Sequence, residues 1–271
     1  MSVNWLIEEF NRDNSFLEIK DEAIKQGHTV NVVESIPFFY DSHWKLFPKG
    51  DCVIFLGSIS CAKQLQREFK NHNWIPGVWC SWENYKCTAY YAYWGDFVLN
   101  SDYTLLPFAE FKRKLEKLFS KDKTLFIRPD RGDKPFNGGI YTEKEISKEL
   151  EYADSLNPED IILISSPKHI EREWRVICSE KKVITGSRYK THGVVDYRRE
   201  LPKEVEDFSN TIINSSFWEP DPIYVLDICC TGNKYFLLEI GSFSVAGLYH
   251  CEFDKIVETA SELARKEHNI Q

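Results

Sequence analysis

Residues 224–240 read YVLDICCTGNKYFLLEI, and this stretch predicts a β-hairpin that carries one carboxylate inside each strand. Two apolar runs of strand length flank Thr231-Gly232-Asn233, which is a good turn sequence. Asp227 lies five residues before Gly232 and Glu239 lies seven residues after it. The two carboxylates can therefore be near neighbours across the hairpin.

A carboxylate buried in an apolar strand is costly unless a cation or a metal ion neutralises its charge. Two carboxylates that face one point offer the oxygen ligands that Mg²⁺ prefers. The alternative is that Asp227 and Glu239 each pair with a buried Arg or Lys. The residues of the hairpin alone leave both interpretations open.

Upstream of the hairpin, residues 170–177 read IEREWRVI and predict another strand. Because side chains alternate along a strand, Glu171, Glu173 and Arg175 share one face. A polar turn at 179–181 pairs this strand with residues 182–187, and Arg188 then lies nearby. The alternative is an exposed ladder of charges, which contributes little stability per ion pair.

Residues 126–139, FIRPDRGDKPFNGG, form an apolar strand that ends in a cation and continues into a glycine-rich loop. Glycines let backbone N–H groups approach an anion, and Arg128 and Lys134 add positive charge for phosphate oxygens. The spacing is not that of a P-loop. An ordinary surface loop with solvated charges is the competing interpretation.

The N-terminal half has the pattern of a strand–helix–strand unit, which is the start of an α/β sheet. We expect a second helix at Ser60–Lys70 with Leu65 and Phe69 facing inward. The polar residues Ser120–Lys123 divide the chain into an α/β domain at 1–120 and a second domain at 121–271.

Two segments of the N-terminal half could bind nucleic acid. Aromatic residues crowd Trp74–Trp94, and a helix at Pro107–Phe119 has a basic face. Aromatic rows can stack bases, but they more often pack in a core, and basic helix faces are usually solvated. The net charge of −8 also argues against a non-specific nucleic-acid binder.

The composition fits a packed intracellular protein. Hydrophobic residues make up 42% of the chain, which excludes a disordered protein. No apolar run reaches the roughly 20 residues of a membrane span, and residues 1–10 do not resemble a signal peptide. The eight scattered cysteines show no zinc-site spacing and predict reduced, buried thiols in the cytoplasm. Nothing in the sequence indicates the oligomeric state.

Taken in order, these elements resemble the ATP-grasp superfamily. Its motifs match a cation before proline at Arg128, a glycine-containing flap at 137–139, an adenine-binding hinge strand at Ile161–Pro167 and a Glu-x-Arg strand at 173–175. A second cationic strand end and the metal carboxylates follow. A small phage and bacterial clade is closer, with the patterns RPD-x-G-x-K-x-F-x-G, E-R-E-x-R, G-S-R-Y and L-D-I…E-I.

The resemblance implies an ATP-grasp fold of two α+β lobes with the nucleotide between them, preceded by a small α/β domain. It also implies an ATP- and Mg²⁺-dependent ligase that joins a small-molecule or peptide carboxylate to an amine through an acylphosphate. ATP would contact Ser165 in the hinge, the carboxylates Glu171 and Glu173, and the cations Arg128, Lys134 and Arg175. Lys134, Arg175 and Arg188 would be catalytic, and Asp227 and Glu239 would hold Mg²⁺.

One position departs from the superfamily pattern. Asn usually follows the second metal carboxylate by two residues, and here that position is Gly241. Either Ser242 or Ser244 replaces it, or a water does, or only one Mg²⁺ binds firmly. This departure motivates an alternative, a regulatory module that binds nucleotide and has lost ligation. A nucleic-acid-modifying ligase is the third alternative.

Overall fold

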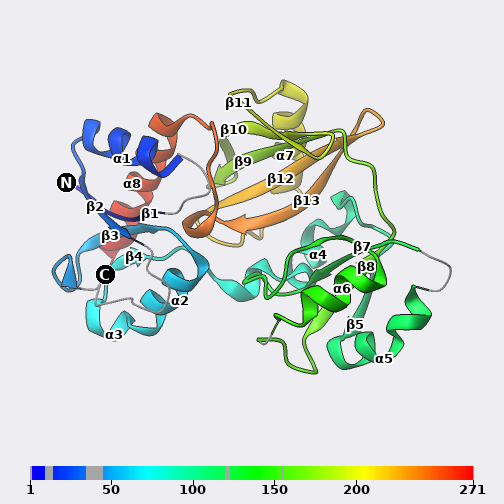
Figure 1. The fold of residues 1–271 in the computed structure, drawn as a ribbon. Helices are drawn as coiled ribbons and strands as arrows, with labels where there is room; N and C mark the ends of the chain where they lie inside the picture. Colours follow the sequence, from blue (N-terminus) through cyan, green and yellow to red (C-terminus); the bar gives the residue numbers. More distant parts are fainter. Residues whose placement is uncertain (1, 10–14, 35–44, 120–122, 154, 271) are drawn as a thin grey trace.

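The computed structural model describes residues 2–9, 15–34, 45–119, 123–153 and 155–270, which form three packed units (Figure 1). The N-terminal unit is built on a parallel sheet, and each of the other two units is built on an antiparallel sheet. The mixed α/β fold and the two α+β lobes expected from the sequence are confirmed.

The N-terminal sheet has helices on both faces. In spatial order its strands are β2 (Thr29–Glu34), β1 (Asn4–Glu9), β3 (Cys52–Leu56) and β4 (Ile75–Gly77). Because side chains alternate, Trp5 packs on one face with α1 (Ser15–Lys25) and α8 (Phe253–Ile270), while Leu6 packs on the other with α2 (Ile59–Arg67). The C-terminal helix therefore covers the N-terminal sheet.

One expectation for this unit is wrong. The predicted helix Ser60–Lys70 ends at Arg67, and a separate short helix, α3 (Phe69–His72), follows it. Leu65 is buried as predicted, but Phe69 is 46% exposed. The break after Arg67 changes the direction of the chain, so the helical spacing from Leu65 no longer carries Phe69 to the same face.

The first lobe contains a four-stranded antiparallel sheet and two helices. Its strands, in spatial order, are β5 (Thr104–Pro107), β8 (Ile161–Ser165), β6 (Leu125–Pro129) and β7 (Gly139–Tyr141). Helices α5 (Phe108–Leu118) and α6 (Glu143–Leu150) share its apolar core. Because β5 pairs with β8, the packing of this lobe begins before the predicted boundary, of which residues 120–122 lie outside the described part of the chain.

The second lobe contains a five-stranded antiparallel sheet, in the order β11 (Val194–Arg198), β10 (Lys182–Thr191), β9 (Arg172–Ser179), β12 (Ile223–Thr231) and β13 (Lys234–Ser242). Trp174 and Leu226 share a buried core with α7 (Lys203–Asn214). Arg175 and Asp227 point to the opposite face, toward the N-terminal unit. Both predicted hairpins are present.

The aromatic stretch folds into η2 (Trp82–Tyr85), α4 (Cys87–Trp94) and η3 (Gly95–Phe97), which lie between the two lobes. Tyr90 and Trp94 are fully buried, and Trp94 contacts the ring of Tyr224 in the second lobe. Backbone and side-chain groups of Thr88 donate to Asp130 in the first lobe. The structure thus supports core packing rather than a base-stacking surface.

Candidate functional site

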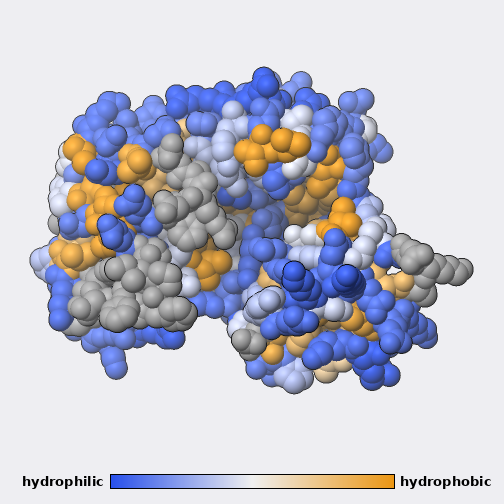
Figure 2. All heavy atoms as spheres, in the orientation of Figure 1, coloured by the Kyte–Doolittle hydropathy of each residue, from blue (hydrophilic) through white to orange (hydrophobic). Residues whose placement is uncertain are grey.

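Two adjoining cavities lie where the three units meet. The lobe cavity, about 270 Å³, is lined by residues of both lobes. The central cavity, about 670 Å³, lies between the second lobe and the N-terminal unit. Figure 2 shows the surface drawn inward between these units. Five residues line both cavities: Arg128, Lys134, Tyr189, Lys190 and Glu239.

The two hairpin carboxylates are direct cross-strand neighbours. Asp227 is paired in register with Glu239, and the register shifts between Asp227 and Ile228. Leu238 is the extra residue of this β-bulge, because Ile228 is paired with Leu237. The bulge compensates for the unequal spacing of the carboxylates from the turn and brings both to the same face.

Each carboxylate is held by cations. Arg175 donates from Nε and Nη2 to the two oxygens of Asp227, at 2.9 and 2.8 Å. Glu239 accepts from Lys134 at 3.0 Å and lies 3.3 Å from Arg128. In this ligand-free chain, the ion pairs that the sequence left as an alternative are therefore formed.

The surroundings shift the two carboxyl groups in opposite directions. Burial raises the pKa of Asp227 above its ordinary value, and the charge of Arg175 opposes this rise. Burial also acts to raise the pKa of Glu239, but Lys134 and Arg128 outweigh it and lower the pKa to about 2. Glu239 is thus a permanently charged acceptor that can exchange cations for a metal ion.

The donor set fits Mg²⁺ only when a ligand supplies further oxygens. The described residues contain no group of three or more His, Cys, Asp or Glu side chains placed to hold a metal. Mg²⁺ is commonly held by one or two carboxylates together with substrate phosphates, which Asp227 and Glu239 satisfy. The pair therefore fits a metal that arrives with a nucleotide.

The departure at Gly241 is not compensated by its neighbours. The Ser242 hydroxyl donates to the carbonyl of Trp79 at 2.6 Å, and the Ser244 hydroxyl accepts from the N–H of Trp79 at 3.0 Å. Both serines are buried in these contacts. Two of the alternatives that the sequence left open, a third ligand from Ser242 or from Ser244, are thereby removed.

The glycine-rich loop is packed closely against its surroundings. A Cβ on Gly138 would lie 3.0 Å from Cβ of Arg128, and one on Gly132 would lie 2.6 Å from Cβ of Tyr85. Lys134 has a φ of 47°, which places it in the left-handed region. These close approaches hold the two cations of the loop against Glu239.

Asp133 joins this loop to the N-terminal unit. It accepts from Arg131 of the loop at 2.9 and 2.6 Å and from Lys63 of α2. Arg131 also donates to Asp160 at 3.0 Å. The loop that carries Lys134 is therefore fastened on both sides by charged hydrogen bonds.

The lobe cavity combines an apolar slot with a charged end. Phe126, Ile170 and Leu238 line it, and side chains of this kind can enclose a flat ring. Glu173 accepts from the hydroxyl of Tyr189 at 2.6 Å, and burial raises the pKa of this carboxyl. The cavity thus offers an apolar place for a base and cations for phosphates.

Three predicted residues lie outside the described linings of both cavities. Ser165 donates to Asn100 at 3.0 Å, and Glu171 accepts from the N–H of Gly232 at the hairpin turn. Arg188 is paired in register with Trp174, so it lies on the opposite face of the sheet from Arg175, where it binds Asp196 and Glu200. Strand alternation therefore removes Arg188 from the site.

Some lining residues were not predicted from the sequence. Lys190 lies in the shared wall, and the only hint of it is that it follows the cationic strand end at Arg188. Tyr189, Tyr197 and Tyr249 line the central cavity from segments far apart in the chain, which no local pattern could have brought together.

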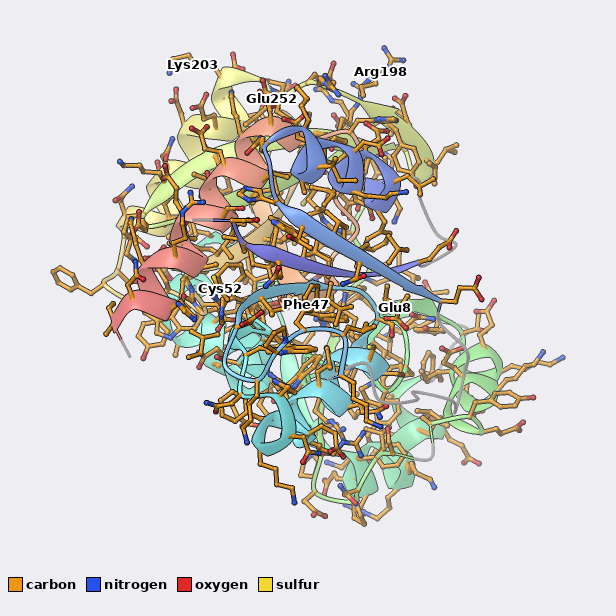
Figure 3. The ribbon with its side chains drawn as sticks, turned by 90° about the vertical axis from the view of Figure 1, so that its left-hand side faces the viewer. Glu8, Phe47, Cys52, Arg198, Lys203 and Glu252 are labelled. Carbon is orange, nitrogen blue, oxygen red and sulfur yellow. The ribbon has the colours of Figure 1, made fainter. Side chains whose placement is uncertain are left out.

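The N-terminal unit presents the carboxyl ends of its parallel strands to the central cavity, where ligands of such sheets bind. Glu8 lies at this end, opposite Cys52 at the start of β3 (Figure 3). The N–H of Ser58 donates to Glu8 at 2.6 Å, and Ser58 caps α2 through a bond from the N–H of Cys61. The first residues of α2 thus form one wall of the cavity.

Comparison with known proteins followed the same division of the chain. Residues 110–259, more than half of the chain, match a family model described as an ATP-grasp domain, the second family of its clade. No curated protein matched. Among the described residues, no helix is long and apolar enough to cross a membrane.

Solved structures of ATP-grasp ligases share the fold at low sequence identity. A D-alanine–D-alanine ligase from Bacillus anthracis has a TM-score of 0.63 at 12% identity, with 99% of each chain covered. The D-cycloserine synthetase DcsG has a TM-score of 0.62 at 12% identity, covering 97% of this chain and 100% of its own. The ATP-grasp ligase PsnB, in complex with a minimal precursor, has 0.52 at 11% identity, with 98% and 100% covered.

Proposed function

Because this chain belongs to the ATP-grasp family whose model it matches, we propose that it is an ATP- and Mg²⁺-dependent ligase that joins a carboxylate to an amine. The observation that carries the proposal is the wall shared by the two cavities. A nucleotide in the lobe cavity and an acid in the central cavity would meet at this wall, where three cations are gathered. Small-molecule or peptide acids and amines are the substrates we propose.

In this proposal the base of ATP occupies the apolar slot of the lobe cavity. The phosphates extend toward Arg128 and Lys134, which release part of their interaction with Glu239. Mg²⁺, bound by Asp227 and Glu239, would neutralise phosphate charge. Arg128 also has its buried Nε–H without an acceptor among the described residues, so it retains a donor for an anion.

The proposed chemistry has two steps. A carboxylate oxygen of the acid attacks the γ-phosphorus, and ADP leaves with the electrons of the broken P–O bond. The amine nitrogen then attacks the carbonyl carbon of the acylphosphate, inorganic phosphate leaves, and the nitrogen loses a proton. Arg175 and Lys190 lie where negative charge develops on the transferred group, and fixed cations lower the energy of such a state.

The proposal is tested by the products that the chain makes. We expect ADP and phosphate release that requires both an acid and an amine from a substrate panel. With an acid alone, the oxygens of ¹⁸O-labelled ATP should scramble between bridge and non-bridge positions, which reports reversible acylphosphate formation. Release of AMP and pyrophosphate would contradict the proposal.

A second candidate function is a regulatory module that binds nucleotide without ligation. Its motive is the metal site, because Gly241 has no side chain and both oxygens of Asp227 are occupied by Arg175. Thermal stabilisation by ATP and Mg²⁺, with no phosphate release across the same panel, would favour this candidate over the ligase.

A further inference from the structure

Three tyrosine rings form a ladder on one wall of the central cavity. Tyr249 is stacked between the other two, with centroids 5.0 Å from Tyr189 at 15° and 5.1 Å from Tyr197 at 24°. The three residues come from β10, from β11 and from the segment before α8. Their stacking across the sheet edge is a product of tertiary structure.

The ladder is held rigidly from the site. The guanidinium of Arg175 lies 4.7 Å from the centroid of Tyr249 and 5.6 Å from that of Tyr189. Arg175 is fixed in turn by Asp227 and by a 2.6 Å bond to the carbonyl of Gly247. Tyr249 has a φ of 49°, a left-handed backbone that an L residue adopts only where its surroundings require it.

The outer ring of the ladder is open. Tyr197 is 39% exposed and lines the cavity, whereas Tyr189 is buried. Among the described residues, the ring contacts of Tyr197 are its stack on Tyr249 and an edge contact with His250 at 74°. The other face of Tyr197 therefore remains available to a further planar group.

The opposite wall also carries an aromatic ring in a fixed position. Trp82 lines the central cavity and donates from Nε1 to Gln66 of α2 at 2.6 Å. The ammonium of Lys63 lies 5.6 Å from its ring centroid. The cavity thus presents aromatic surface from both the N-terminal unit and the second lobe.

The charges in the cavity select an anion. Among its described lining residues, four are cations, namely Arg128, Lys134, Arg175 and Lys190, and two are carboxylates, Asp227 and Glu239. The side chains therefore carry an excess of two positive charges. A neutral or cationic occupant would leave this excess uncompensated in a partly enclosed space.

We propose that the central cavity binds a carboxylic acid that carries an aromatic ring, with its carboxylate at the shared wall and its ring on the open face of Tyr197. This inference rests on the proposed function, because it names the acid that the ligase would activate. The same chemistry describes a free aryl acid and the carboxyl end of a peptide that finishes in an aromatic residue.

Calorimetric titration of the full chain, with ADP and Mg²⁺ present, separates ring stacking from simple apolar burial. The free-acid pair is 3-phenylpropanoate and its saturated analogue 3-cyclohexylpropanoate. The peptide pair is acetyl-diglycyl-phenylalanine and the corresponding cyclohexylalanine peptide. We expect the aromatic member of at least one pair to bind about fivefold more tightly, as one aromatic pair provides.

The position of the ring is tested with three variants. Tyr197→Leu should abolish the preference for the aromatic member, and Tyr197→Phe should retain it. Tyr152→Leu removes a tyrosine that is 77% exposed at the end of α6 and outside the central cavity, and it should leave the preference unchanged. ADP affinity measured on each variant shows that the fold is intact.

The outcomes separate this inference from the proposed function. A preference confined to one pair identifies the source of the acid as free or peptidic. Equal binding within both pairs, or a preference that survives Tyr197→Leu, would overturn the inference. Ring-dependent binding without phosphate release would instead retain the acid site and remove the ligase activity.

Discussion

Replacing Glu239 with glutamine removes the negative charge that Lys134 and Arg128 share in the ligand-free chain. The folded protein keeps this carboxyl ionised to unusually low pH because the two cations outweigh the cost of burial and lower its pKa to about 2. In the unfolded chain the pKa returns to its ordinary value near 4.5. The difference links protein stability to pH through one residue.

The size of the effect follows from the two pKa values. A difference of about 2.5 pH units corresponds to about 3 kcal/mol of unfolding free energy. The side chain is 23% exposed, so solvent screening reduces this figure only moderately. Because the folded pKa is the lower one, the contribution is complete above pH 4.5 and is lost as the pH falls toward 2. At pH 3 about 2 kcal/mol has gone.

Urea unfolding followed by tryptophan fluorescence at pH 6 and pH 3 measures this contribution. The stability difference between the native chain and Glu239→Gln should shrink by about 2 kcal/mol between these pH values. Glu110→Gln is the control, because Glu110 pairs with Lys114 on an exposed helix face and should change stability by less than about 1 kcal/mol. A difference for Glu239→Gln that is the same at both pH values would refute the reasoning.

Four further expectations follow from the site. Asp227→Asn leaves Arg175 without its charged partner, so urea unfolding should show a loss of about 3–5 kcal/mol and a phosphate-release assay should show no turnover; an active variant would remove Asp227 from the metal site. Lys134→Met should raise the KM for ATP about tenfold or more, the value of a charged hydrogen bond, and an unchanged KM would place the phosphates elsewhere. Gly132→Ala forces a Cβ against Tyr85 and should lower the unfolding free energy by about 1–3 kcal/mol; undiminished stability would show that the loop can yield. All eight cysteines are buried, and burial raises the pKa of Cys80 to about 12, so a disulfide reagent should label them only after unfolding, and labelling of the native chain would contradict this.

The local parts of the structure were predictable from the sequence. Alternation along the strands placed Glu173 and Arg175 on one face, and the turn at Gly232 predicted that Asp227 and Glu239 are neighbours. These inferences succeed because the period of a strand and the geometry of a tight turn depend on residues close together in the chain. The apolar runs that define both hairpins are local in the same sense.

Arg188 shows where local reasoning ended. Its place at a strand end next to Tyr189 suggested a role at the phosphates, but the face on which it lies depends on the register between β9 and β10, which shifts between Arg188 and Lys190. A register shift of one residue exchanges the two faces of a strand. The same shift accompanies the appearance of Lys190 in the shared wall, where the sequence had placed Arg188.

By itself the sequence determined the order of the strands and hairpins, the cations of the glycine-rich loop and the pair of carboxylates, because each is written in a few adjacent residues. Only the tertiary structure decided that both carboxylates bind cations, that Ser242 and Ser244 are committed to Trp79, and that three tyrosines stack over Arg175. These features join residues from separate units. Their partners are selected by packing across the whole chain, which no short stretch of sequence specifies.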